Sequence, residues 1–298
     1  MHIPDGFLST PVWAALDVVG IPTAGYIVRV AQREFEDSKV PLLGVMGAFV
    51  FAAQMINFPV GVGTSGHLVG GALLACTLGP AAASVVMTAI LAIQALVFQD
   101  GGILALGANV FNMAIVGVFA GYLPYYLWGR GRARRASIFA AGALSVAVSA
   151  LLAMAELLLS GVHMPASILG VSLGLFAVSA LIEGAITMAV IGALEAIQPN
   201  FPRPLAAARA RNYAVGALAL AALVLAAGGV VAASTAPDGI ERLALDTGIA
   251  QHARTWIASP LKDYQAGFLG AGWPAQAGAG VLGIAMAGGL CVLIGRKR

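Results

Sequence analysis

The chain has 298 residues, of which 60% are hydrophobic and 10% are charged, and its mean hydropathy is +0.91. Soluble domains carry roughly 25% charged residues, so this composition excludes an ordinary soluble fold and predicts a polytopic membrane protein. The formal charge of +3 does not point to nucleic acid as a partner, because the basic residues cluster beside apolar segments and not among aromatic residues. Cys76 and Cys291 each stand alone, which excludes a zinc-finger spacing.

The chain begins Met1-His2-Ile3-Pro4-Asp5-Gly6-Phe7, and its first two residues place an α-amine, an amide nitrogen and an imidazole within reach of one metal ion. Amines and neutral imidazoles are good donors for borderline transition metals, and a near-planar nitrogen set suits Ni(II) or Cu(II). The segment has no basic stretch typical of a cleaved signal peptide, so we expect Met1 to be retained. The N-terminus is therefore a candidate metal site.

Nine apolar segments follow, and a membrane-spanning helix needs about 20 such residues. They are residues 12–28, 40–58, 67–78, 81–98, 108–128, 138–159, 168–197, 213–233 and 277–294. The third is short and ends at Gly79-Pro80, where the chain either turns or forms a re-entrant element.

The distribution of basic residues favours counting the third segment as a short or tilted span. With an external N-terminus and nine crossings, all but three of the 16 Lys and Arg residues lie on the cytoplasmic side; the exceptions are Arg242, Arg254 and Lys262. The sequence thus predicts an all-α polytopic membrane protein with about nine transmembrane helices, an extracytoplasmic N-terminus and a cytoplasmic C-terminus. A proline-rich break near residue 205 predicts a seven-helix core, residues 1–205, and a two-helix module, residues 206–298, whose loop 234–276 is extracytoplasmic.

This topology puts His67 on the same external face as His2. His67 follows a turn with glycines at 61, 63 and 66, which permit conformations and close approaches that other residues do not. Such a turn brings His67 toward the N-terminal segment as a fourth nitrogen donor. A histidine at a membrane boundary that simply bonds a carbonyl group is the alternative.

Four polar residues on this face are candidates for supporting the metal ligands. Asn109 and Asn112, three apart on one helical face, either orient an imidazole or cap and bond neighbouring helices. Thr64 and Ser65 either fix His67 or cap the third helix. His163 and His252 have no assigned role, with a solvated loop residue as the favoured interpretation of His163. Glu183 lies within an apolar span, where a carboxylate bonds a neighbouring helix or marks a proton pathway.

The N-terminal string, the turn Gly63-Thr64-Ser65-Gly66-His67-Leu68 and the stretch Gly107-Ala108-Asn109-Val110-Phe111-Asn112-Met113 together resemble the CbiM/NikM family. These proteins are the substrate-capture membrane subunits of energy-coupling-factor transporters for cobalt and nickel. The resemblance covers about residues 1 to 205. It implies that Met1 (amine), His2 (amide and imidazole) and His67 hold Ni(II) or Co(II) as the transported substrate, in a square plane of four nitrogens.

The segment Ala236-Pro237-Asp238-Gly239-Ile240-Glu241 resembles the Pro-Asp-Gly-Leu-Glu motif of the small CbiN/NikN accessory subunits, with Ile240 in place of leucine. This implies a fusion of the two subunits. The chain contains no Gly-x-x-x-x-Gly-Lys-Ser/Thr string, so no phosphate-cradling loop is expected. The family implies instead that a separate membrane coupling subunit and cytoplasmic ATPases drive uptake, and that the chain is no enzyme and has no catalytic cofactor.

Three functions stay open from the residues alone. The preferred one is nickel capture in a prokaryotic cell membrane, with cobalt as the alternative metal. A proton-coupled secondary carrier would depend on Glu183, and a membrane scaffold would bind no metal.

Overall fold

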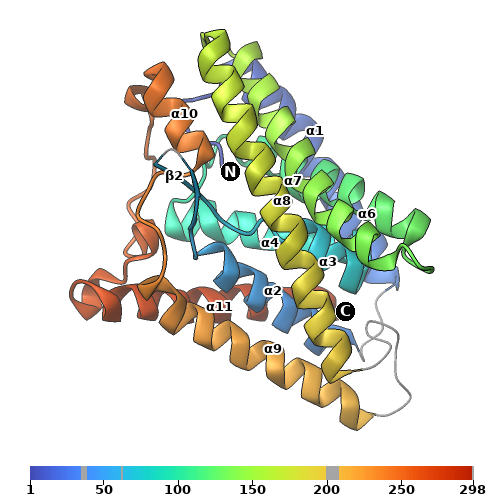
Figure 1. The fold of residues 1–298 in the computed structure, drawn as a ribbon. Helices are drawn as coiled ribbons and strands as arrows, with labels where there is room; N and C mark the ends of the chain where they lie inside the picture. The colour runs from blue at the N-terminus through green and yellow to red at the C-terminus, as the bar shows by residue number, and fades with distance from the viewer. Residues whose placement is uncertain (35–38, 62, 199–207, 297–298) are drawn as a thin grey trace.

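The computed structural model describes residues 1–34, 39–61, 63–198 and 208–296, and helices dominate it (Figure 1). The α-helices are α1 (Thr10–Glu34), α2 (Val40–Gln54), α3 (Gly71–Leu78), α4 (Pro80–Ile93), α5 (Leu106–Asn109), α6 (Gly117–Trp128), α7 (Arg134–Leu159), α8 (Ala166–Ile197), α9 (Ala208–Gly228), α10 (Gly239–Thr247) and α11 (Trp273–Gly295). Two π-helical turns, η2 (Gln94–Phe98) and η3 (Val110–Val116), extend α4 and join α5 to α6. The described residues also form four 3-10 turns, at η4 (Gly229–Val231), η5 (Ile249–His252), η6 (Lys262–Tyr264) and η7 (Gly267–Leu269), and two short strands, β1 (Phe58–Gly61) and β2 (Thr64–Gly66).

Seven of the described helices are long and apolar enough to cross a membrane, which supports a multi-pass membrane protein. They are Thr10–Arg33, Pro80–Phe98, Leu106–Trp128, Arg134–Leu159, Ala166–Ile197, Tyr213–Val231 and Trp273–Gly295. The second and third predicted spans form the 15-residue α2 and the 8-residue α3, both shorter than the roughly 20 residues of a full crossing. Nine full crossings are therefore not confirmed among the described helices.

Helix α3 begins at Gly71, so the prediction that His67 opens it is wrong. Gly70 has a φ of 79°, in the left-handed region that ends helical continuity. The carboxylate of Glu183 on α8 also accepts hydrogen bonds from the backbone amides of Val69 and Gly70, at 2.8 Å each. His67 therefore lies in an extended segment that is held from the side by α8.

Helices α9 and α11 pack against α2 (Figure 1). Small residues permit this approach: a Cβ atom at Gly44 of α2 would lie 2.5 Å from Val292 of α11, and one at Gly283 would lie 2.1 Å from the Phe51 ring. The C-terminal helices thus share an interface with the rest of the chain. The predicted domain boundary at residue 205 lies outside the described residues, as do Arg203, Lys297 and Arg298.

The predicted glycine-rich turn forms an antiparallel hairpin of β1 and β2, in which Phe58 pairs with Gly66. The segment before α10 lies alongside β2, because the Ser65 amide donates to the Pro237 carbonyl at 2.8 Å and the Ser65 hydroxyl donates to the Ala236 carbonyl at 2.7 Å. The N-terminus lies beside β2 and α10 in Figure 1. Three segments far apart in the sequence therefore meet at one end of the molecule.

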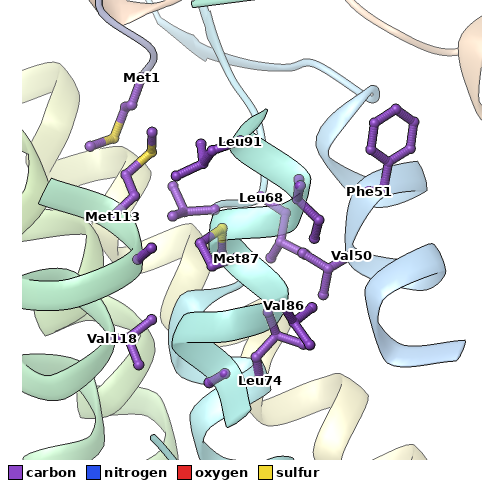
Figure 2. Close-up of a cluster of buried hydrophobic side chains, with 14 of the residues drawn as sticks. Met1, Val50, Phe51, Leu68, Leu74, Val86, Met87, Leu91, Met113 and Val118 are labelled. Atoms are coloured by element: carbon purple, nitrogen blue, oxygen red, sulfur yellow. The ribbon is translucent and has the colours of Figure 1, made fainter. Parts of the chain in front are cut away.

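Below this meeting point lies a cluster of buried hydrophobic side chains (Figure 2). Met87 of α4 and Leu74 of α3 are fully buried within it. The side chain of Met1 enters the same cluster and lies next to Met113 of η3 (Figure 2). Burial of this thioether side chain anchors the first residue, and with it the position of its amine.

Candidate metal centre

The N-terminal segment is enclosed by the protein, with Ile3 completely buried and His2 nearly so. Asn109 holds Ile3 from both sides: its side-chain oxygen accepts from the Ile3 amide at 2.8 Å, and its side-chain nitrogen donates to the Ile3 carbonyl at 3.0 Å. The Gly102 amide donates to the same carbonyl at 2.9 Å. These bonds fix the backbone directly after His2.

The carboxylate of Asp5 secures the next stretch of the segment. It accepts hydrogen bonds from the amides of Ile103 and Leu104, at 2.8 Å each, and of Ala105 at 3.1 Å. Three bonds to one carboxylate satisfy the amides that precede α5, and they join the N-terminus to the loop that carries Asp100.

The Met1 amine donates to Nε2 of His67 at 2.9 Å and to Oδ2 of Asp238 at 2.7 Å. The other ring nitrogen of His67, Nδ1, lies 2.9 Å from the Leu68 carbonyl oxygen, a partner that only a protonated Nδ1 satisfies. Nε2 is then the nitrogen that carries a free electron pair. The structure thus brings together two of the predicted donors, the amine of residue 1 and His67.

Burial, the charge of the Met1 amine and the neighbouring His2 lower the pKa of His67 to about 4. At neutral pH its imidazole is therefore unprotonated and competent to bind a metal. Burial would raise the pKa of Asp238, but the charges of the Met1 amine and His67 outweigh it and lower this pKa below its ordinary value. Asp238 is consequently a carboxylate, facing an amine.

The ring of His2 stacks on that of His67, with ring centroids 5.4 Å apart and planes 9° from parallel. Its Nδ1 lies 2.8 Å from Oδ1 of Asp100, and its Nε2 is buried with no protein partner. A chelate with the amide of the same residue requires Nδ1, so the structure has this nitrogen turned to Asp100 and not to the Met1 amine. His2 lies at the site, and its coordination through Nδ1 requires Asp100 to release it.

Asp100 is in turn held by the C-terminal part of the chain. The Tyr264 hydroxyl donates to Asp100 Oδ2 at 2.5 Å and accepts from the side-chain nitrogen of Gln94 at 3.1 Å. Burial would raise the pKa of Asp100, but the charge of His2 and its hydrogen bond outweigh this effect and hold the pKa well below its ordinary value. Burial and the Asp100 carboxylate raise the pKa of Tyr264, which keeps its hydroxyl a donor.

Among the described contacts, none of the four candidate supporting side chains hydrogen-bonds the ring of His2 or His67. Asn109 binds the Ile3 backbone and no imidazole, and Asn112 donates to Glu156 of α7 at 2.8 Å. Ser65 bonds Ala236 and caps no helix, since α3 follows Gly70 without a side-chain cap. The Thr64 hydroxyl is buried without a protein partner. Asn112 thus follows the alternative of bonding a neighbouring helix, and Asn109 holds the backbone next to His2.

Two further histidines contribute no ring to this arrangement, although the backbone carbonyl of His252 lies against Gly6. His163 is exposed in the turn after α7, in keeping with a solvated loop residue, and His252 is exposed in η5. Throughout the described residues, no three His, Cys, Asp or Glu side chains gather into a metal-binding group by themselves. A metal site here would therefore need the amine of Met1 as a donor in addition to the imidazoles.

Sequence reasoning missed three carboxylates here. Asp5 lies in the N-terminal motif without a predicted role, Asp100 follows a predicted span, and Asp238 lies in the segment that resembles the accessory-subunit motif. The one available signal was their position on the predicted external face, shared with His2 and His67.

Seven spans with a buried N-terminal amine next to an imidazole define a multi-pass membrane protein with a candidate transition-metal centre. Residues 2–201 match the family model described as CbiM, the cobalt uptake substrate-specific transmembrane region. The chain belongs to this family, and it is a component of cobalt or nickel transport and not an enzyme.

The chain is 43% identical over 203 residues to a putative metal transport protein of Haloquadratum walsbyi, covering 67% of this chain and 92% of that relative. It is 40% identical over 206 residues to a putative fused nickel transport protein, NikMN, of Archaeoglobus fulgidus, covering 67% of each. A crystal structure of a truncated transition metal transporter superposes with a TM-score of 0.58 at 35% identity, covering 65% of this chain and 98% of that structure. The C-terminal third of this chain, which these comparisons leave unmatched, fits a fused CbiN-like module.

Proposed function

We propose that the chain captures Ni(II), or alternatively Co(II), at the extracytoplasmic face as the substrate-specific subunit of an energy-coupling-factor importer. The observation that carries this proposal is the 2.9 Å separation between the Met1 amine and Nε2 of His67. A divalent ion replaces the proton between them and bonds both nitrogens. His2 supplies further nitrogen donors directly beside this pair.

The donor types favour a late first-row metal. Amine and imidazole nitrogens suit nickel, copper, cobalt and zinc, whereas calcium and magnesium take oxygen ligands. Affinity at such a site rises from cobalt to nickel, and nitrogen donors in a near-planar set tilt the choice toward nickel. The name of the Archaeoglobus fulgidus relative, a fused nickel transport protein, agrees with this choice, and the family description refers to cobalt.

In this proposal the site faces outward, and the basic loops face the cytoplasm. Residues 206–298 act as a fused accessory module whose loop, residues 234–276, lies over the N-terminal segment. Release of the metal into the cell depends on a separate membrane coupling subunit and cytoplasmic ATPases. Nothing in the proposed role requires a catalytic cofactor or nucleic acid.

Titration calorimetry of the purified chain with Ni(II) and Co(II) tests the assignment. We expect His2→Ala, His67→Ala and the addition of one residue before Met1 each to abolish high-affinity nickel binding, because each removes or displaces a donor nitrogen. His163→Ala is the matched control, since its ring is exposed in a distant turn. Unchanged one-to-one binding of nickel by all three altered proteins would contradict the assignment of this site.

A further inference from the structure

The loop between α9 and α11 ends in a short turn that exposes large apolar side chains. This segment, residues 267–273, contains η7 and the first residue of α11, and we call it the η7 turn. Phe268 is 67% exposed, Leu269 is 49% exposed and Trp273 is 53% exposed. A contiguous apolar patch of this kind marks a surface that contacts a protein or a membrane.

The distribution of charge favours the membrane. Lys262 and Asp263 are exposed in the loop, but no charged residue occurs between positions 264 and 295. Helix α11 uses 23 residues of this uncharged run, which already satisfies the roughly 20 residues of a crossing. The η7 turn is therefore an uncharged extension of the apolar run, at the end where α11 begins.

The η7 turn folds back along α11. The Ala266 amide donates to the Ala275 carbonyl at 3.0 Å, and Leu269 occupies the space where a Cβ atom at Gly278 would lie. Gly278 follows Trp273 by five residues, which is roughly 8 Å along the helix axis. The exposed side chains of the turn therefore lie beside the first turns of α11, one of the seven helices able to cross a membrane, and not beyond its end.

The backbone of the η7 turn suits a partly apolar environment. The Leu269 amide donates to the Ala266 carbonyl at 2.8 Å, and the Gly270 amide donates to the Gly267 carbonyl at 3.2 Å. Amides that are bonded within the turn cost less to remove from water than free ones. Gly270 and Gly272 have φ values of 94° and 78°, a region that favours glycine, and these two residues allow the chain to reverse toward α11.

Trp273 marks the level of the membrane boundary. Its indole nitrogen donates to the Ala227 carbonyl of α9 at 2.7 Å, and its ring stays half exposed. Tryptophan is enriched at membrane–water interfaces, because its apolar ring contacts lipid while its N–H group has a hydrogen-bond partner. Helices α9 and α11 pack against each other, so the η7 turn lies at the edge of two candidate spans.

We propose that the η7 turn is an interfacial anchor, which inserts Phe268 between the lipid headgroups and the upper acyl chains of the leaflet in which α11 begins. Interfacial elements enter a bilayer by about 5–10 Å, which matches the position of the turn along α11. Tyr264, which donates to Asp100 beside the candidate metal centre, lies shortly before this turn. Lipid contact would therefore fix the end of the loop that reaches the N-terminal segment.

Fluorescence quenching in phosphatidylcholine nanodiscs tests the anchor with the purified full chain. Phe268→Cys is labelled with the thiol-reactive dye NBD, and the native Cys76 and Cys291 are buried and should take up little dye. Leu245→Cys is the matched control, because Leu245 is 59% exposed in the same loop but lies among the charged residues of α10. One quencher is a doxyl group carried by the lipid near its headgroup, and the other is iodide in the water.

We expect the lipid-borne doxyl group to quench the dye at Phe268→Cys at least about twofold more strongly than at Leu245→Cys, and iodide to give the opposite order. Lipid quenching at Phe268→Cys that is no stronger than at Leu245→Cys would overturn the proposal. Protection of the Phe268→Cys dye from both quenchers would indicate contact with protein, such as a second copy of the chain, and would overturn it as well. Neither measurement uses nickel, so the result is independent of the metal site.

Discussion

The surroundings of His67 agree with its proposed role as a metal ligand. Its Nδ1 faces the Leu68 carbonyl, which leaves the electron pair of Nε2 free, and burial with the nearby Met1 amine lowers its pKa and keeps the ring unprotonated. The sequence predicted that His67 and the N-terminus meet, but not the tautomer or the neighbouring carboxylates. The tautomer depends on how the ring is turned toward the Leu68 carbonyl, and the carboxylates, Asp100 and Asp238, lie 33 and 171 positions further along the chain.

The lowered pKa of His67 predicts a loss of stability in mild acid when metal is removed by a chelator. Between about pH 6.5 and pH 4 the unfolded chain gains a proton on this ring that the folded chain does not, so the free energy of unfolding falls by up to ~3 kcal/mol. His67→Gln removes this contribution. Melting temperatures measured across this range should therefore fall less steeply in His67→Gln, and parallel curves for the two proteins would contradict the prediction.

At the scale of elements, the segment before α3 depends on α8. The sequence predicted a helix from His67 because residues 67–78 are continuously apolar, and hydrophobicity alone does not distinguish a helix from a buried extended segment. The left-handed Gly70 and the carboxylate of Glu183 decide between them. Both backbone amides bonded by Glu183 lie within three residues of His67, so α8 positions the imidazole that we propose as a metal ligand.

Glu183→Gln is expected to lower the melting temperature and weaken nickel binding together. An amide side chain has one acceptor oxygen, so one of the two amides of Val69 and Gly70 loses its partner, at a cost of about 1.5–3 kcal/mol. Glu195→Gln removes a carboxylate from the same helix, where it pairs with Arg134 far along α8. Calorimetry should show weaker nickel binding only in Glu183→Gln. If the chain were a proton-coupled carrier, Glu183→Gln would abolish transport while nickel binding persisted.

At the scale of the whole molecule, the loop between α9 and α11 contacts the N-terminal segment at two points and the neighbouring Asp100 at a third. Asp238 contacts Met1, Tyr264 contacts Asp100, and the Arg254 amide donates to the Asp5 carbonyl at 2.9 Å. These contacts require the loop and the N-terminus to lie on the same side of the membrane. The basic turn between α6 and α7 joins the C-terminal end of α6 to the N-terminal end of α7. Asn109, which holds Ile3 of the N-terminal segment, precedes the other end of α6.

Labelling with a membrane-impermeant maleimide tests this arrangement in intact cells. Leu245→Cys places a thiol on the exposed face of α10 and should react from outside, whereas Arg132→Cys should react only after the membrane is permeabilised. The native Cys76 and Cys291 are buried and should give little background. Labelling of Arg132→Cys alone from outside would reverse the proposed orientation.

The sequence by itself determined the membrane class, most of the long helices and the pairing of Met1 and His2 with His67. Apolar length and charge asymmetry act locally along the chain, so they can be interpreted without a fold. Only the tertiary structure decided that Asn109 holds the backbone of Ile3, that Asp100 takes His2 Nδ1 and that Asp238 reaches the amine. These contacts join segments about 100 or more residues apart, where helix packing and not local pattern sets the distance.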